Sequence, residues 1–279
     1  MNERELTGYP SIDKPWQQYY SEEALHAPLP GGSMYDYMAA CNADRLEKTA
    51  LNYFGRKFSY LELFCEIDRA AAAFCKIGIS SGTVVMAFAL NTPECIVSIY
   101  ALNRLGAIVD LQYADQSPRE ALENLQCTHA RFILTADTFL PLVQDTLELG
   151  NFGTSVQVIT VSPARSLPPL KRLFLPAPRC RTKADNILSF DGILVGLHDP
   201  IPPGKADDPA LIVHTSGTTG VPKGVLLSNK NVNAVAVEYK NSLLELRPGD
   251  SILNIAPPFV AFGICLAIHT PLCLGMQVC

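Results

Sequence analysis

Residues 83–94 read Thr-Val-Val-Met-Ala-Phe-Ala-Leu-Asn-Thr-Pro-Glu. The run before Asn91 carries no charge and follows Gly82, as is typical of a strand that is covered on both faces. Thr92 can cap a helix by accepting a hydrogen bond from a free backbone N–H of the first turn, and Pro93 suits the first helical position. The stretch therefore predicts a buried strand that leads directly into a helix.

Upstream of this stretch, the sequence predicts a hairpin and a further helix. Residues 51–58 are two apolar segments around Gly55, Arg56 and Lys57, which favours a short hairpin. Ser59 followed three residues later by Glu62 is a capping-box pattern. Apolar residues then recur at helical spacing up to Gly78, where the helix should end.

Downstream, strands and helices continue to alternate. A second helix should end near Gly106, and Ser117-Pro118-Arg119-Glu120 repeats the helix-start pattern. Further strands are predicted at 107–111, 131–135 and 156–161, with a helix over 137–149. This order favours an α/β fold in which layered parallel sheets are flanked by helices.

The composition indicates a globular protein that does not bind nucleic acid. Of the 279 residues, 48% are hydrophobic and 18% are charged, so the chain has enough apolar surface to offset the entropy lost on folding. The net charge of −5 is spread along the chain without a basic cluster. The sequence therefore shows no positively charged surface of the kind that binds DNA or RNA.

The nine cysteines and the first residues bear on the cellular compartment. The cysteines are scattered and mostly lie in apolar runs, so we interpret them as buried thiols in a reducing cytoplasm. None of them has the spacing of a zinc site, and the metal ligands stay unknown. Residues 1–13 are polar and lack the apolar core of a signal peptide, so the sequence predicts a cytoplasmic location.

Two segments raise the question of membrane contact. Residues 251–279 carry no Asp, Glu, Lys or Arg, but prolines and glycines interrupt the run, so we favour a buried strand and helix over a membrane span. Residues 162–184 are rich in proline and basic residues. We favour a solvated loop there over a patch that docks on a membrane surface or a partner.

The segment Thr-Ser-Gly-Thr-Thr-Gly-Val-Pro-Lys-Gly at 215–224 stands between two apolar strands and predicts a phosphate-binding loop. Its glycines permit backbone turns that aim amide groups at an anion, its hydroxyls add donors, and its lysine adds a positive charge. The expected ligands of the phosphates are Thr215, Ser216, Gly217, Thr218, Thr219, Gly220, Lys223 and Gly224. A Walker loop does not fit, because Pro222 replaces its second glycine and Gly224 its Ser or Thr.

Residues 215–224 resemble the signature loop of the acyl-adenylate-forming superfamily, which contains acyl-CoA synthetases, peptide-synthetase adenylation domains and luciferases. Three weaker likenesses follow the order of that family: residues 58–63 are similar to "(T/S)YxEL", residues 102–109 to "LKxGAxxVP", and residues 257–263 to "PxFHxxG". The resemblance covers nearly the whole chain.

The resemblance implies that ATP and Mg²⁺ activate a carboxylic acid as an acyl-adenylate and that coenzyme A then takes the acyl group. Lys223 is the expected catalytic residue, because it would neutralise charge on the phosphates. Phe259, Val260, Phe262 and Gly263 are expected to line the acid pocket. Val260 replaces the family's usual His or aromatic residue, which favours a fatty or other apolar acid. The alternative is that Phe259 and Phe262 are ordinary core residues.

The same resemblance implies that residues 1–279 are part of an amino-terminal AMP-binding domain. A first α/β subdomain should cover 59–228, a second should begin at 229–279, and the carboxy-terminal domain is expected to be absent. We therefore expect a truncated domain that does not complete adenylation alone.

Three alternatives remain open at this point. One is a peptide-synthetase-type adenylation unit that serves a carrier protein, and another is a noncatalytic nucleotide-binding module. The third is a membrane-associated protein.

Overall fold

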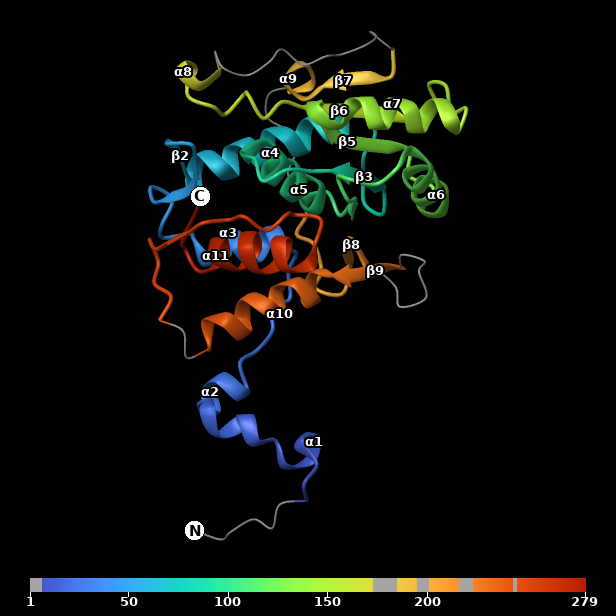
Figure 1. The fold of residues 1–279 in the computed structure, drawn as a ribbon. Helices are drawn as coiled ribbons and strands as arrows, with labels where there is room; N and C mark the ends of the chain where they lie inside the picture. Colours follow the sequence, from blue (N-terminus) through green and yellow to red (C-terminus); the bar gives the residue numbers. More distant parts are fainter. Residues whose placement is uncertain (1–6, 173–184, 195–200, 216–222, 243–244) are drawn as a thin grey trace, which may run out of the picture.

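The computed structural model describes residues 7–172, 185–194, 201–215, 223–242 and 245–279. The first half of the chain contains α1 (Pro10–Asp13), η1 (Pro15–Tyr19), α2 (Glu22–Leu25), α3 (Met34–Cys41), β1 (Thr49–Tyr53), β2 (Arg56–Ser59), α4 (Tyr60–Lys76), β3 (Val84–Phe88), α5 (Pro93–Arg104), β4 (Ile108–Leu111), α6 (Pro118–Thr128) and β5 (Phe132–Ala136). The second half contains η2 (Asp137–Phe139), α7 (Leu140–Leu149), β6 (Gln157–Val161), α8 (Pro169–Arg172), β7 (Ile187–Ser189), α9 (Phe190–Ile193), β8 (Pro209–Thr215), β9 (Lys223–Ser228), α10 (Asn229–Lys240), β10 (Ser251–Ile252), η3 (Phe262–His269), α11 (Thr270–Cys273) and β11 (Gln277–Val278). Figure 1 shows this order, with α1 and α2 below the body of the molecule.

A seven-stranded sheet forms the centre of the fold, in the order β7-β6-β5-β3-β4-β8-β9. All neighbouring pairs are parallel except β8 and β9, which form an antiparallel hairpin at one edge. The chain passes from β4 across β3 to β5, so the direction in which strands are added reverses between β3 and β5. In open α/β sheets, the carboxyl edge at such a reversal is where ligands bind.

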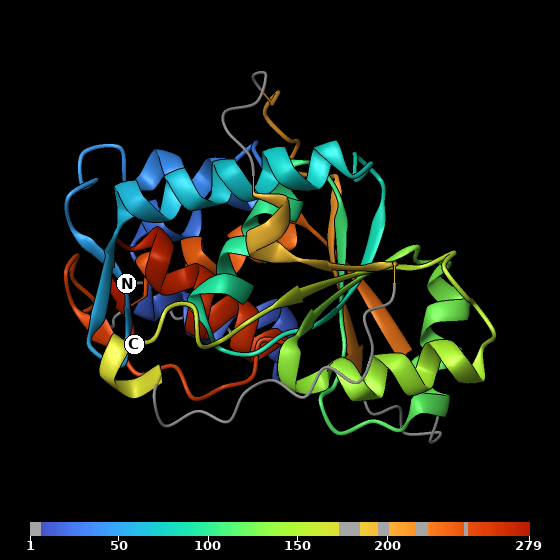
Figure 2. The same ribbon diagram turned by 90° about the horizontal axis from the view of Figure 1, so that it is seen from above.

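Helices cover both faces of this sheet. Successive residues of a strand point to opposite sides, so the apolar residues of one strand pack against helices on both faces. On β3, Met86 and Phe88 pack in one apolar cluster with residues of α6 and α7, whereas Val85 and Ala87 belong to another cluster with α4 and α5. Figure 2 shows α6 and α7 on one side of the sheet and α4 on the other. The predicted α/β fold with parallel-rich, helix-flanked sheets is confirmed.

A second sheet has the order β10-β11-β1-β2. Its strands come from both ends of the chain, because β1 pairs in parallel with β11 and antiparallel with β2. Residues 49–59 therefore share a sheet with residues 251–278. The division into subdomains at 59–228 and 229–279 stays a prediction.

The predicted helix starts are confirmed. Ser59 and Glu62 form a capping box at α4, and Ser117 and Glu120 form another at α6. Thr92 accepts a hydrogen bond from the backbone N–H of Cys95 and so caps α5. These side chains satisfy backbone groups that a helix leaves without partners at its first turn, so local sequence suffices to mark each start.

Residues 162–172, the described part of the loop predicted at 162–184, differ from the prediction by the short helix α8. The strand β7 follows that segment and pairs in parallel with β6. The seven-stranded sheet therefore has a strand that was not predicted from the sequence. The interpretation of the cysteines is also wrong in part, because Cys65 on α4 and Cys127 on α6 are exposed.

Residues 251–279 contain the predicted buried helix, whereas the short strands β10 and β11 are only partly buried. The helical part consists of the π-helix η3 followed by α11, and most of its residues are buried. Within the described residues, no helix is both long and apolar enough to cross a membrane.

Candidate functional site

The two ends of the predicted phosphate loop lie side by side at the edge of the seven-stranded sheet. Thr215 is the last residue of β8 and pairs with Lys223, the first residue of β9. Residues paired across antiparallel strands point to the same face, so the hydroxyl and the ammonium group emerge together, and both residues are exposed. Gly224 follows on β9, whereas Ser216, Gly217, Thr218, Thr219 and Gly220 lie outside the described residues.

The strand that leads into the loop is held by a buried pair of ionisable side chains. The Nε2 atom of His214 lies 2.7 Å from Oδ1 of Asp110 on β4. Asp110 is fully buried and His214 is 7% exposed. Asp110 pairs in register with Ile212, two residues before His214, so both side chains lie on the same face of neighbouring strands.

A network of amide side chains extends this pair. The amide nitrogen of Gln112 lies 3.0 Å from the same Nε2 atom of His214. The oxygen of Gln112 accepts hydrogen bonds from Gln116 at 3.0 Å and from Asn124 of α6 at 2.9 Å. Because Gln112 directly follows β4, this network lies at the carboxyl edge of the sheet.

Gly224 has little room for a side chain. A Cβ at this position would lie 3.0 Å from Cγ2 of Ile212 and 3.6 Å from Cε1 of His214. A contact of 3.0 Å is tighter than ordinary van der Waals distance, so glycine allows β9 to pack closely against the His214 ring.

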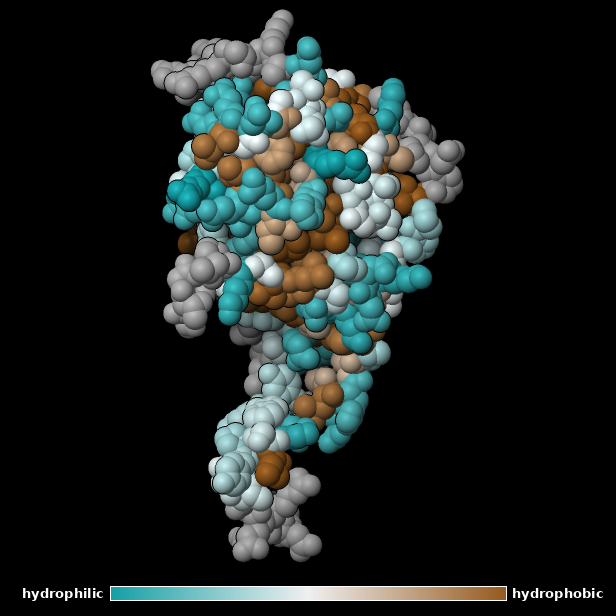
Figure 3. All heavy atoms as spheres, turned by 90° about the vertical axis from the view of Figure 1, so that its right-hand side faces the viewer, coloured by the Kyte–Doolittle hydropathy of each residue, from teal (hydrophilic) through white to brown (hydrophobic). Residues whose placement is uncertain are grey.

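The hydrophobic surface of this edge is visible in Figure 3, which views the side on which β8 and β9 lie in Figure 1. Hydrophobic residues gather in the middle of that face. Val225 and Leu226 are 42% and 54% exposed, and β9, to which they belong, is one of the two edge strands among the described residues of the sheet. Exposed apolar residues on an edge strand are a surface to which further chain can pair.

The residues predicted to line the acid pocket differ in their burial. Phe259 is partly buried against the main core, and its ring lies 5.1 Å from the ring of Tyr113, measured between centroids. Val260 is half-buried, and Phe262 is 62% exposed. The alternative that both phenylalanines are core residues is therefore wrong for Phe262.

Gly263 is required by a close approach of backbone. A Cβ at this position would lie 1.8 Å from the carbonyl oxygen of Pro257, a distance at which atoms cannot coexist. The buried Gly263 thus allows the start of η3 to fold back over residues 256–257. π-helical turns are rare and frequently occur at functional sites.

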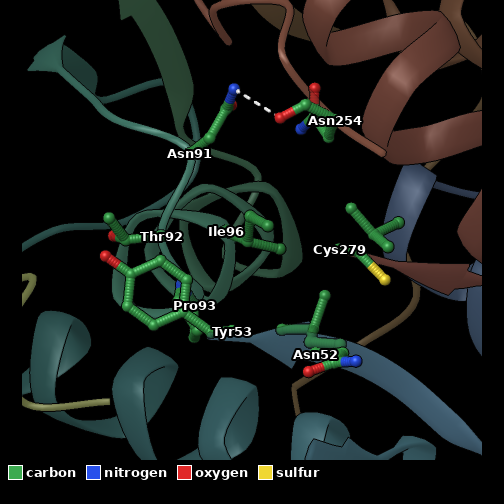
Figure 4. Close-up of a pocket in the computed structure, with 10 residues that line it drawn as sticks. Asn52, Tyr53, Asn91, Thr92, Pro93, Ile96, Asn254 and Cys279 are labelled. Atoms are coloured by element: carbon green, nitrogen blue, oxygen red, sulfur yellow. Dashed lines mark hydrogen bonds between the residues drawn. The ribbon is translucent and has the colours of Figure 1, made fainter. Parts of the chain in front are cut away.

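The stretch that leads to Phe259 is tied to the start of α5. The side-chain amide of Asn91 donates to the carbonyl oxygen of Ala256 at 2.8 Å and approaches that of Asn254 at 3.4 Å. Figure 4 shows the Asn91 amide pointing toward the backbone carbonyl of Asn254. Both residues line a small cavity of about 20 Å³, together with Thr92, Pro93 and Ile96. The cavity has room for one water molecule and not for a substrate.

Burial also affects Glu94 in the first turn of α5. Its side chain is 1% exposed, and desolvation raises its pKa above the ordinary value for a glutamate.

No group of three or more His, Cys, Asp or Glu residues in the described part of the chain is arranged to hold a metal ion.

Sequence reasoning missed Asp110, Gln112, Tyr113 and His214. Each of them lies near the carboxyl end of β4 or β8, and their contacts join residues about a hundred positions apart. The signal that could have found them is the position of polar residues in the last positions of a predicted strand or directly after it, because the carboxyl ends of parallel strands meet at one edge of a sheet.

Known proteins resemble this chain in sequence and in fold. The sequence pattern of the family described as AMP-binding enzyme matches residues 38–279. A long-chain-fatty-acid–CoA ligase of Bacillus subtilis (strain 168) is 24% identical over 95% of this chain and 49% of its own length. A crotonobetaine/carnitine–CoA ligase of Proteus sp. (strain LE138) is 30% identical over 73% of this chain and 37% of its own length.

The solved structure of the anthranilate CoA ligase AuaEII in complex with anthranoyl-AMP has the same fold over 91% of this chain and 46% of its own, with a TM-score of 0.75 and 23% identity. The chain thus spans half or less of the length of these proteins. Because the family pattern covers most of the chain, we conclude that the chain belongs to the AMP-binding enzyme family.

Proposed function

We propose that the protein to which this chain belongs uses ATP to join an apolar carboxylic acid, fatty or aromatic, to coenzyme A. The carboxylate attacks the α-phosphorus of ATP and releases pyrophosphate, and the thiol of coenzyme A then displaces AMP from the acyl-adenylate. The observation that carries the proposal is the exposed pair of Thr215 and Lys223 at the carboxyl edge of a parallel sheet. A hydroxyl and an ammonium group at such an edge suit a phosphate chain.

The residues of this chain would bind and orient the nucleotide. Lys223 would offset the negative charge that develops on the departing pyrophosphate, and the Thr215 hydroxyl would donate a hydrogen bond to it. The remaining donors, Ser216, Gly217, Thr218, Thr219 and Gly220, are proposed from their sequence alone. Mg²⁺ would neutralise further phosphate charge when bound, and at such sites the phosphates themselves and one or two carboxylates usually hold it.

The acid would bind near Phe259 and Val260. The half-buried Phe259 and the absence of a charged residue from 251–279 favour an apolar acid over a charged one. We also propose that the reaction requires a longer polypeptide than these residues, because the related ligases are about twice as long. A cytoplasmic location is proposed from the cysteine usage and composition alone.

ATP–pyrophosphate exchange tests this proposal. The complete product of the gene that encodes this chain is incubated with ATP, labelled pyrophosphate and, in turn, octanoate, palmitate, benzoate or 4-coumarate. We expect exchange that depends on one of these acids, and we expect residues 1–279 alone to give none. If ATP binds but no acid stimulates exchange, a noncatalytic nucleotide-binding module is the better account. Acyl transfer to a carrier protein in place of coenzyme A would indicate a peptide-synthetase-type unit.

A further inference from the structure

Tyr113 contacts both parts of the candidate site. Its hydroxyl donates a hydrogen bond of 2.8 Å to the carbonyl oxygen of His214, the residue before Thr215. Its ring packs against that of Phe259 with 5.1 Å between centroids and a tilt of 60°. One half-buried side chain therefore joins the strand that enters the phosphate loop to the stretch predicted to line the acid pocket.

A second side chain holds each of the two segments that Tyr113 contacts. The His214 ring is held by Asp110, which is fully buried in the neighbouring strand. The stretch before Phe259 is held by Asn91, whose amide donates to the carbonyl oxygen of Ala256 at 2.8 Å. These contacts limit the positions that His214 and Phe259 can take. A small shift of either residue therefore also moves the Tyr113 side chain.

We propose that Tyr113 is a positioning residue that couples binding of the acid at Phe259 to binding of ATP next to Thr215. This inference rests on the proposed function. A ligand that packs against Phe259 fixes the Tyr113 ring and, through its hydroxyl, the end of β8. The second ligand then meets a site that has already lost part of its conformational freedom, and its affinity rises. Thermodynamic linkage requires the effect to be equal in both directions.

The substitution Tyr113→Phe tests the inference, because it removes the hydroxyl and keeps the ring against Phe259. Calorimetry on the complete gene product measures the affinity for α,β-methylene-ATP, which cannot transfer its AMP group to an acid, with and without saturating octanoate or benzoate. In the unchanged protein, we expect the acid to raise the nucleotide affinity by about fivefold or more. In Tyr113→Phe, we expect the acid to change the nucleotide affinity by no more than about twofold. This decrease in coupling corresponds to the loss of one ordinary hydrogen bond.

Tyr35→Phe is the matched control. The Tyr35 hydroxyl donates to Asp68 at 3.3 Å, and its ring lies under Arg104, the last residue of α5, at the opposite end of that helix from Asn91. This variant also loses a tyrosine hydrogen bond but should keep the coupling. Phe259→Leu should lose the coupling, and the double variant Tyr113→Phe, Phe259→Leu should lose no more than either single one.

The outcomes separate the inference from the proposed function. Unchanged coupling in Tyr113→Phe, or an equal loss in Tyr35→Phe, overturns the role of Tyr113 while ATP and acid binding still support the proposed function. If the unchanged protein binds neither the nucleotide nor any acid, the proposed function fails, and the inference fails with it.

Discussion

The His214 ring lies 2.7 Å from the carboxylate of Asp110, with both side chains buried between β4 and β8. Replacing His214 removes the side chain that contacts Asp110, whereas replacing Asp110 still leaves the amide of Gln112 3.0 Å from the His214 ring. We expect His214→Leu to lower the free energy of unfolding by about 3–5 kcal/mol, because it leaves a buried carboxylate unpaired. The double variant Asp110→Leu, His214→Leu should lose less than the sum of the two single variants, as measured by urea unfolding.

The exposed pair His26 and Glu22 provides the control for this cycle. Its atoms are 3.5 Å apart, and the two side chains are 79% and 90% exposed. Solvent screens such a pair, so His26→Leu should leave the unfolding midpoint unchanged. An equal effect of His214→Leu and His26→Leu would contradict the role we assign to the buried pair.

Lys223 is exposed at the start of β9, so its replacement should affect ligand binding more than folding. We expect Lys223→Gln to weaken ATP binding by about 10- to 100-fold, the effect of losing one charged hydrogen-bond donor. Lys230→Gln removes another exposed lysine, whose ammonium group lies 3.9 Å from a carboxylate oxygen of Asp207. Calorimetric titration with ATP compares the variants, and equal losses in both would show that Lys223 acts only through the net charge.

The local elements of this fold are predictable from sequence because their signals are local. Ser59 and Glu62 are three residues apart, and the capping box they form follows from helix geometry alone. The strand over residues 84–88 was visible for a similar reason, since its apolar run is continuous.

The candidate site was only partly predictable because its contacts depend on strand register. Asp110 meets His214 only if β4 and β8 are neighbours in the observed register, which no local pattern states. The second sheet poses the same difficulty, because Leu51 pairs with Val278 across nearly the whole chain.

The capping box at Ser59 can be measured directly. Its hydroxyl accepts a hydrogen bond of 3.1 Å from the backbone N–H of Glu62, at the start of a helix with many buried residues. We expect Ser59→Ala to lower the free energy of unfolding by about 1 kcal/mol. Ser21 caps the four-residue helix α2, which has no buried residue, so Ser21→Ala should leave urea unfolding of the core unchanged. Equal destabilisation by both variants would contradict this account.

Gly263 should tolerate no side chain, because a Cβ would lie 1.8 Å from the carbonyl oxygen of Pro257. We expect Gly263→Ala to displace residues 257–263 and to lower the free energy of unfolding by about 1–3 kcal/mol. The matched control is Gly31→Ala, where no atom lies within 4 Å of the added Cβ. Urea unfolding compares the two, and a Gly263→Ala protein as stable as Gly31→Ala would show that the backbone can relax without cost.

His269 should make folding stability depend on pH. Burial lowers its pKa to about 3 in the folded protein, where its Nδ1 lies 2.9 Å from the Tyr100 hydroxyl and its Nε2 lies 2.9 Å from Oδ1 of Asn233. In the unfolded chain the imidazole has its ordinary pKa of about 6.5, so between these two values the unfolded state binds one more proton. The stability from this group is therefore complete above pH ~6.5 and falls by roughly 1.4 kcal/mol per pH unit as the pH decreases toward 3.

The raised pKa of Glu94 acts in the opposite direction, because the folded state then holds the extra proton, so the slope for the whole protein is a sum. Comparison of variants isolates His269. Urea unfolding at pH values from 7.5 to 4.5 measures how the free energy of unfolding changes with pH. In His269→Asn, this slope should be smaller by the contribution of about one proton, whatever the stability of the variant at neutral pH. His26→Gln, at an exposed histidine, should keep the slope of the unchanged protein. An unchanged slope in His269→Asn would mean that this imidazole is already protonated in the folded core, and its contacts with Tyr100 and Asn233 would then have to accommodate a buried charge.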